Sequence, residues 1–282
     1  MAIKIAKSKS APAMSSSSPV EGGASGRRVV WEQATAEITQ RNVLMEAYGD
    51  TGSGRSTFAL TAPGPIAYIH ASEKLEGITQ VAVARGTDVR LVDFGGVFAG
   101  SEDQIAALAQ EKWQLLKDAW YDALFGGWAR TVVLDTHTEA WELIRLAYFG
   151  ALKPTGGRVD SNYGPVNADW RSLFKAARQQ DKVNAIVIGQ TKDEYKKSKT
   201  GKSDGMGERT GDTIRAGQKE VPYLCDAVVR TDKNVMSGEG FWGTIEKGWF
   251  NAGVEGVALH NDMLTFPGVM AMITDMDESE WR

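Results

Sequence analysis

The sequence predicts an α/β fold with a mainly parallel sheet, flanking helices and an antiparallel extension at the C-terminal end. Three observations lead to this prediction. Short, nearly continuous apolar runs alternate with amphipathic helical patterns, as expected of strands that crossover helices bury on both faces. A glycine-rich turn lies between the first apolar run and a helical segment. Beyond Cys225 the pattern changes to short strand-like runs joined by turns.

Five apolar runs are expected to form the parallel part of the sheet. They are Asn42–Tyr48 (NVLMEAY), Pro65–His70 (PIAYIH), Val89–Phe94 (VRLVDF), Thr131–Asp135 (TVVLD) and Asn184–Gly189 (NAIVIG). Three later segments are expected to be the antiparallel strands: DAVVR (226–230), GTIEKGWF (243–250) and DMLTF (262–266).

Capping signals and apolar spacing predict the crossover helices. Ser101 followed by Gln104, and Thr136 followed by Glu139, have the spacing of a capping box, which marks a helix start. The helix after the first box carries an apolar stripe formed by Ile105, Leu108, Leu115, Trp120 and Leu124. A later helix has apolar residues at i, i+3, i+4 and i+7, namely Trp170, Leu173, Phe174 and Ala177.

Composition excludes several classes of protein. The net charge of −4 over 282 residues gives no global attraction to nucleic acid, so any basic surface must be local. Cys225 is the only cysteine, which rules out an intrachain disulfide. No apolar run approaches the roughly 18 residues that a membrane helix needs. We expect a soluble cytoplasmic protein in which a disordered tail, residues 1–28, precedes one domain, residues 29–282.

The glycine-rich turn YGDTGSGRST (48–57) matches the phosphate-loop pattern G-x-x-x-x-G-K-[ST] with one departure. Its strand–loop–helix setting is the one in which backbone N–H groups hold phosphates. Arg55 replaces the lysine, which keeps the charge on a bulkier, planar group. We expect nucleotide binding to survive and hydrolysis to be slow. The predicted nucleotide-binding residues are Gly49, Asp50, Thr51, Gly52, Ser53, Gly54, Arg55, Ser56 and Thr57.

Polar residues at other strand ends complete the predicted site. Ser56 and Asp135, the last residue of TVVLD, are predicted to organise Mg²⁺. Gln190 follows NAIVIG and is predicted to contact a γ-phosphate or its attacking water. The next segment, TKDEYKKSKTGKSDGMGERTGD, is interpreted as a polar loop that contacts nucleic-acid phosphates. Its candidate residues are Lys192, Lys196, Lys197, Lys199 and Lys202, although a solvated loop would also have this composition.

The order of the motifs resembles the RecA-like P-loop ATPases, most closely the small phage-encoded ATP-binding proteins linked to single-strand annealing and recombination. The resemblance runs from about Asn42 to Thr274 and rests on YGDTGSGRST, YIHASE, TVVLDT, NYG, AIVIGQ and GTIEKGWFNAG. It implies a RecA-like fold, ATP and Mg²⁺ as cofactors and single-stranded DNA as a partner. A single-strand annealing or binding protein would be a further partner, and the cytoplasm of a bacterial host the location.

The resemblance also implies roles for individual residues. Glu73, three residues beyond His70, has the position of the catalytic glutamate that acts as general base. Lys247 lies in the late strand whose basic residue reaches the nucleotide of a neighbouring subunit in a ring or filament. Leu152–Val166 and Thr191–Lys219 correspond to the loops that face DNA.

Two alternatives to a DNA-dependent ATPase stay open. Arg55 favours a structural or regulatory protein that binds nucleotide without hydrolysing it. The segment GQTKDEY partly resembles the guanine-reading motif N-K-x-D of GTPases, with Glu194 as the final acid. Against the GTPase, Thr191 stands in place of the asparagine, and Asp135 begins DTHT instead of D-x-x-G.

Overall fold

The computed structural model describes residues 42–71, 76–96, 99–151, 163–196, 208–234 and 240–281. The chain divides into two units, Met1–Ile38 and Thr39–Arg282, and every described residue belongs to the second. The predicted tail, residues 1–28, lies outside the described residues, so its boundary stays a prediction. No helix in the described part of the chain is long and apolar enough to cross a membrane.

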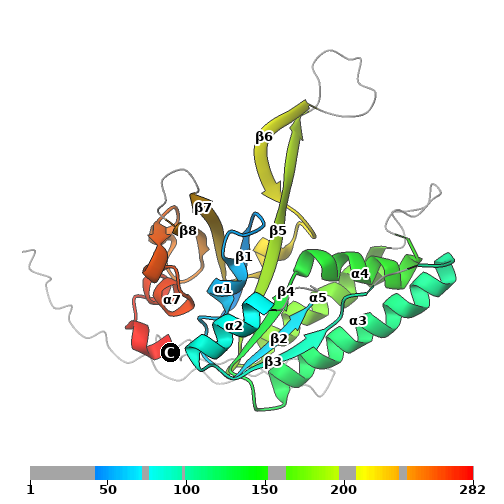
Figure 1. Ribbon diagram of the computed structural model, residues 1–282, viewed down its shortest axis with the longest axis horizontal. Coiled ribbons are helices and arrows are strands. Elements are labelled where there is room, and N and C mark those ends of the chain that lie inside the picture. The colour runs from blue at the N-terminus through cyan, green and yellow to red at the C-terminus, as the bar shows by residue number, and fades with distance from the viewer. Residues whose placement is uncertain are drawn as a thin grey trace, which may run out of the picture. The chain divides into compact units, whose positions relative to one another are not determined.

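The described residues form the expected alternation of strands and helices (Figure 1). The strands are β1 (Leu44–Gly49), β2 (Ile66–His70), β3 (Val89–Asp93), β4 (Thr131–Asp135), β5 (Asn184–Lys196), β6 (Glu208–Arg215), β7 (Ala227–Asn234), β8 (Gly240–Gly248) and β9 (Ala258–His260). The helices are α1 (Arg55–Ala59), α2 (Glu76–Arg85), α3 (Glu102–Phe125), α4 (His137–Phe149), α5 (Tyr163–Gln179), α6 (Val221–Leu224) and α7 (Phe266–Thr274).

The strands form a mixed sheet in the order β3-β2-β4-β5-β1-β7-β8-β9, and β6 pairs with β5. The pairs from β3 through β7 are all parallel. β8 runs antiparallel to both β7 and β9. The predicted parallel sheet with an antiparallel C-terminal extension is therefore confirmed.

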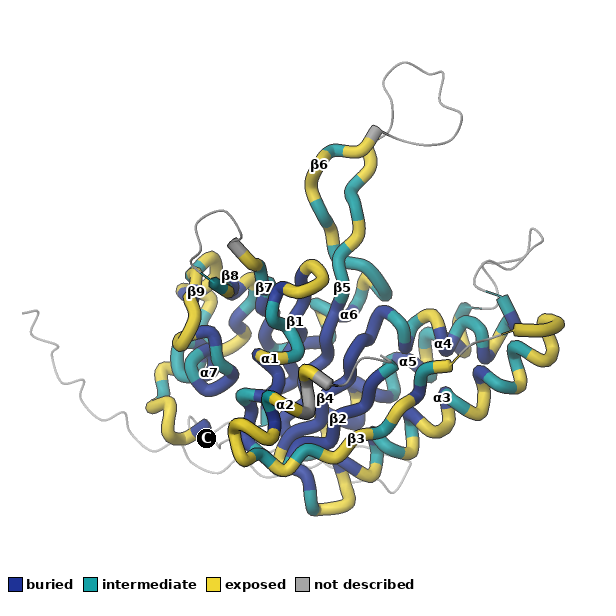
Figure 2. The backbone as a smooth tube through the Cα atoms, viewed as in Figure 1, coloured by how far each residue is buried: buried dark blue, intermediate teal, exposed yellow. Residues whose placement is uncertain are grey.

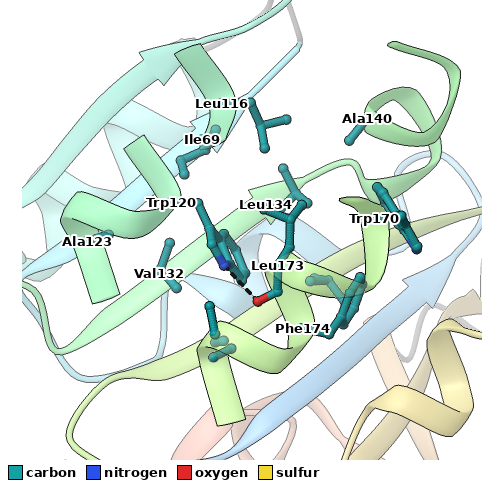
Figure 3. Close-up of a cluster of buried hydrophobic side chains, with 14 of the residues drawn as sticks. Ile69, Leu116, Trp120, Ala123, Val132, Leu134, Ala140, Trp170, Leu173 and Phe174 are labelled. Atoms are coloured by element: carbon teal, nitrogen blue, oxygen red, sulfur yellow. Dashed lines mark hydrogen bonds between the residues drawn. The ribbon is translucent and has the colours of Figure 1, made fainter. Parts of the chain in front are cut away.

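Helices α3, α4 and α5 supply the core on one face of the sheet, and α1 and α7 supply it on the other. The first core centres on tryptophans (Figure 3), where the indole Nε1 of Trp120 donates to the Leu173 carbonyl at 3.0 Å. The predicted apolar face of α5 is buried, as its spacing indicates. In α3, however, Leu115 is 40% exposed, and Trp113 and Leu116 face the core in its place.

The strand predicted to end at Gly189 is longer than its apolar run. β5 continues to Lys196, and its outer half pairs with β6 to form a two-stranded ribbon, Thr191–Lys196 with Glu208–Arg215, that projects from the sheet. Figure 2 shows that this β5–β6 ribbon is only partly buried or exposed along its length. Because neither face meets a core, the ribbon lacks the apolar alternation by which a strand is recognised in sequence.

The prediction that DMLTF (262–266) forms a strand is wrong. Asn261–Met263 form a short 3₁₀ turn, and α7 begins directly after Thr265. The Thr265 hydroxyl accepts a hydrogen bond from the Gly268 N–H at 3.1 Å, and Pro267 occupies the first turn, where its missing N–H costs nothing. The third antiparallel strand is instead β9.

Candidate nucleotide-binding site

The glycine loop connects the C-terminal end of β1 to α1, as the sequence predicts. Gly52 and Gly54 have φ of 79° and 88°, a region that side chains disfavour. A Cβ on Gly49 would lie 2.1 Å from the Thr231 carbonyl oxygen of β7, so this position also requires glycine. The buried Ser53 hydroxyl lies 2.8 Å from the Thr231 hydroxyl and fixes the loop against the sheet.

Ser56 and Asp135, the predicted magnesium pair, are brought together in space. Strand β5 separates β4 from β1, but the Ser56 hydroxyl of α1 still donates to Asp135 Oδ2 at 2.8 Å. The Tyr68 hydroxyl of β2 donates to the same oxygen. Tyr68 is not among the residues predicted from the sequence, where its only signal is a single phenol within the apolar run PIAYIH.

Arg55 extends from the start of α1 toward β5. Its Nη1 donates to the Gly189 carbonyl at 2.6 Å. Burial lowers the pKa of the guanidinium from its ordinary value, and the nearby carboxylates of Asp135 and Asp50 act in the opposite direction. The cation at the lysine position of the motif is therefore partly buried and bound to backbone.

A cavity of about 690 Å³ opens beside the glycine loop, within the size range of small-molecule sites. Thr51, Arg55, Ser56, Asp135 and Gln190 line it, together with residues of α2 and the start of α4. Thr57 lines it as well, so the structure gathers six of the predicted site residues around one space.

Glu139 also lines this cavity, although its place in the sequence predicts only a capping residue. Its backbone N–H donates to the Thr136 hydroxyl at 3.2 Å, and that hydroxyl donates to Glu139 Oε2 at 2.9 Å. Burial raises the pKa of the Glu139 carboxyl. The capping pattern gave no indication that the Glu139 carboxylate borders the same cavity as Asp135.

The donor set of the cavity fits Mg²⁺. Ser56 and Asp135 offer hydroxyl and carboxylate oxygens, the hard ligands that Mg²⁺ prefers. Within the described residues, no three or more His, Cys, Asp or Glu side chains form a complete metal site.

A second cavity, of about 360 Å³, lies on the other side of Thr57, which lines both spaces. Its wall contains the Phe241 ring, 39% exposed, which also packs against Gly54. Arg85, Asn261 and Asp262 supply polar groups. An aromatic face with hydrogen-bonding groups around it can hold a planar heterocycle.

The base of the β5–β6 ribbon is tied to the glycine loop and to α4. The Thr191 hydroxyl donates to Asp50 Oδ1, and the Gln190 N–H donates to the Thr138 hydroxyl at 3.2 Å. Gln190 lies within β5, at the pair with Gly49 where parallel pairing to β1 ends, so it is not a strand tip as predicted.

Several predicted site residues lie elsewhere. Lys192 and Lys196 belong to the β5–β6 ribbon and not to a loop, because β5 extends past its apolar run. Lys247 is at the opposite end of the sheet from the glycine loop, where its Nζ donates to the carbonyls of Pro222, at 3.0 Å, and Cys225. Outside the described residues lie Glu73, Lys197, Lys199, Lys202 and most of Leu152–Val166.

Comparisons with known proteins agree with this geometry at the level of family. Residues 41–253 match the model of a protein family described as an AAA domain. No curated protein matches the sequence.

Two solved structures are similar in fold. A crystal structure of the RadB recombinase aligns with a TM-score of 0.44 at 16% identity, over 78% of this chain and 87% of that one. A prototypical ATPase from the type III secretion system of pathogenic bacteria aligns with a TM-score of 0.39 at 14% identity, over 67% and 52%.

Proposed function

The chain belongs to the AAA domain family, and we propose that it binds ATP with Mg²⁺ and hydrolyses it. From the motif resemblance we further propose that single-stranded DNA stimulates this hydrolysis. The observation that carries the nucleotide site is the Ser56–Asp135 hydrogen bond at the wall of the 690 Å³ cavity. This hydrogen bond joins the helix that follows the glycine loop to Asp135 of β4, a strand that is not adjacent to β1. Bound magnesium would neutralise charge on the phosphates there.

The two cavities suggest how the nucleotide lies. Phosphates would occupy the larger cavity, beside Arg55 and Ser56. The base would occupy the smaller one, against Phe241, because Thr57 forms the wall between them. In this orientation the γ-phosphate would lie toward Asp135 and Gln190.

Hydrolysis requires a base for the attacking water, and Glu73 remains the proposed residue. Glu73 lies outside the described residues; Ala71, two residues before it in the sequence, donates its N–H to the Asp135 carbonyl at 3.0 Å. Gln190 would contact the γ-phosphate or its water. Glu139 is the acid within the described residues that also borders this space.

We place the DNA-binding role on the β5–β6 ribbon and the lysine-rich segment that joins its strands. Thr191 at the ribbon base bonds to Asp50 of the glycine loop, which supports communication between nucleotide and ribbon. A role in phage-type recombination, annealing or replication follows from the motif resemblance, as does a single-strand annealing or binding protein as partner. Self-association into a ring or filament would let Lys247 reach a neighbouring nucleotide.

The alternative of a nucleotide-binding protein that does not hydrolyse draws support from Arg55. Its guanidinium is bound to Gly189, so the charge normally placed on phosphates is engaged elsewhere. The GTPase alternative loses support, because Glu194 bonds to the Thr210 hydroxyl at 2.9 Å within the ribbon and lines neither cavity.

Calorimetry and phosphate release test the proposal together. ATP should bind in a Mg²⁺-dependent manner, more tightly than GTP, and single-stranded DNA should increase phosphate release. Ser56→Ala should weaken the magnesium-dependent part of binding, with exposed Ser279→Ala as a matched control. No binding at millimolar ATP with Mg²⁺ would refute the nucleotide site, and binding without any phosphate release would favour the regulatory alternative.

A further inference from the structure

One oxygen of Asp135 accepts two hydrogen bonds. Ser56 donates to Oδ2 from α1, and Tyr68 donates to the same atom from β2. Both donors therefore use one side of the carboxylate. Oδ1 accepts neither of these two hydroxyls.

The register of the sheet explains why Tyr68 can reach Asp135. His70 of β2 pairs with Asp135 of β4, and Tyr68 pairs with Val133, two residues earlier on each strand. Side chains two residues apart on a strand share a face, so Tyr68 and Asp135 lie on the same face of the sheet. This is the face that α1 covers, and Ser56 therefore approaches from the same layer.

The Tyr68 ring is fully buried, and its hydroxyl is directed to the acid. In this hydrogen bond the phenol donates and the carboxylate oxygen accepts. A buried phenol in an apolar strand has few other ways to satisfy its hydroxyl.

From this geometry we propose that Tyr68 is a positioning residue that orients Asp135 for magnesium, an inference that rests on the proposed nucleotide site. Groups that hydrogen-bond a metal-ligating carboxylate fix its orientation, and their loss typically lowers metal affinity by about 10- to 100-fold. Ser56 alone cannot do this, because its hydroxyl is itself expected to approach the metal. Tyr68 contacts the acid but does not line the 690 Å³ cavity, so it can hold Asp135 without itself approaching the metal.

A purely structural role would give a different result. If Tyr68 only satisfies a buried polar group, removal of its hydroxyl should change the stability of the fold and leave magnesium dependence untouched. The two roles separate when nucleotide affinity is measured with and without Mg²⁺.

The test is calorimetry of a non-hydrolysable ATP analogue across a Mg²⁺ series, on wild type and Tyr68→Phe. We expect the Mg²⁺ concentration for half-maximal enhancement of binding to rise about 10- to 100-fold, with metal-free affinity unchanged. Tyr121→Phe is the matched control, because its hydroxyl contacts Ser172, away from both cavities. It should behave as wild type.

The outcomes distinguish the inference from the proposed function. Equal Mg²⁺ dependence in wild type and Tyr68→Phe overturns the role of Tyr68 alone. Absence of any Mg²⁺-dependent binding in wild type overturns the nucleotide site and the inference with it. Tyr68→Met, of similar bulk and also without a hydroxyl, is the second variant. If circular dichroism shows both variants to be unfolded, the hydroxyl is structural and the inference is overturned.

Discussion

Arg55→Lys is the substitution that best tests how far the altered glycine loop can work. The wild-type guanidinium donates to the Gly189 carbonyl at 2.6 Å while it lines the phosphate cavity. When a triphosphate binds, either the Arg55 guanidinium leaves that carbonyl or the phosphates interact with only part of its positive charge. Lysine at this position has a shorter side chain with a compact ammonium. It can contact phosphates without first breaking a hydrogen bond to the Gly189 carbonyl.

The hydrogen bond to Gly189 sets the size of the expected effect. A hydrogen bond from a charged group contributes about 1.5–3 kcal/mol. Each 1.4 kcal/mol in a barrier changes a rate about tenfold. If the wild type gives up this bond on the way to the transition state, Arg55→Lys should raise turnover by roughly 10- to 100-fold. ATP affinity should change less, because both side chains carry the same charge.

Steady-state phosphate release at saturating ATP, with and without single-stranded DNA, measures the effect, and calorimetry measures affinity separately. Arg178→Lys is the control, because Arg178 pairs with Asp226 away from the cavity and should leave turnover unchanged. If the wild type already hydrolyses ATP rapidly and Arg55→Lys does not increase the rate, the reasoning fails, and Arg55 does not slow hydrolysis.

Three other perturbations probe assembly, acidity and DNA binding. Mixing Lys247→Ala with Glu73→Ala protomers should restore part of the activity if Lys247 acts across a subunit boundary; monomers in light scattering with ATP and DNA, without rescue, would exclude this. Burial raises the pKa of Glu139, so the folded state holds this proton more tightly than the unfolded chain does. The stability that this contributes is complete below the unfolded pKa, about 4.3, and is lost as pH rises through the folded pKa. Glu139→Gln should therefore flatten that part of the pH dependence in urea unfolding, and an unchanged profile would contradict it. Replacing Lys196, Lys197 and Lys199 with alanine should weaken single-stranded DNA binding and reduce its salt dependence. Affinity equal to wild type across a salt series would show that these lysines are only solvated.

Much of the fold could be predicted because its strands are buried on both faces. Thr131–Asp135 has the bounds expected from its apolar run, and the Ser101–Gln104 capping box is present at the start of α3. The prediction failed where burial is one-sided or absent. DMLTF is as apolar as a strand, but Thr265 and Pro267 start a helix there, and turn chemistry outweighs composition.

The candidate site was predictable to the extent that its motifs are local. The glycine loop could be identified from spacing alone, and Asp135 from its place at the end of an apolar strand. Tyr68 and Glu139 could not, because their roles depend on register between β2 and β4 and on which face of α4 borders the cavity. Arg55 was recognised as unusual, but its bond to Gly189 depends on strand order.

The charges of the β5–β6 ribbon restrict where nucleic acid can bind. Thr191–Lys196 and Glu208–Arg215 together carry four basic and four acidic side chains, so the paired strands have no net charge. Arg209 is also paired with Asp193 at 2.5 Å. The connecting residues 197–207 carry three lysines and one aspartate, so if the chain binds single-stranded DNA as proposed, we expect most phosphate contacts there. With a slope of about −0.7 per phosphate neutralised on a single strand, the three connecting lysines alone would give a log–log salt slope of about −2, and all five candidate lysines about −3.5. A measured slope near −5 would show that other surfaces carry the binding and that the ribbon is not the main DNA contact.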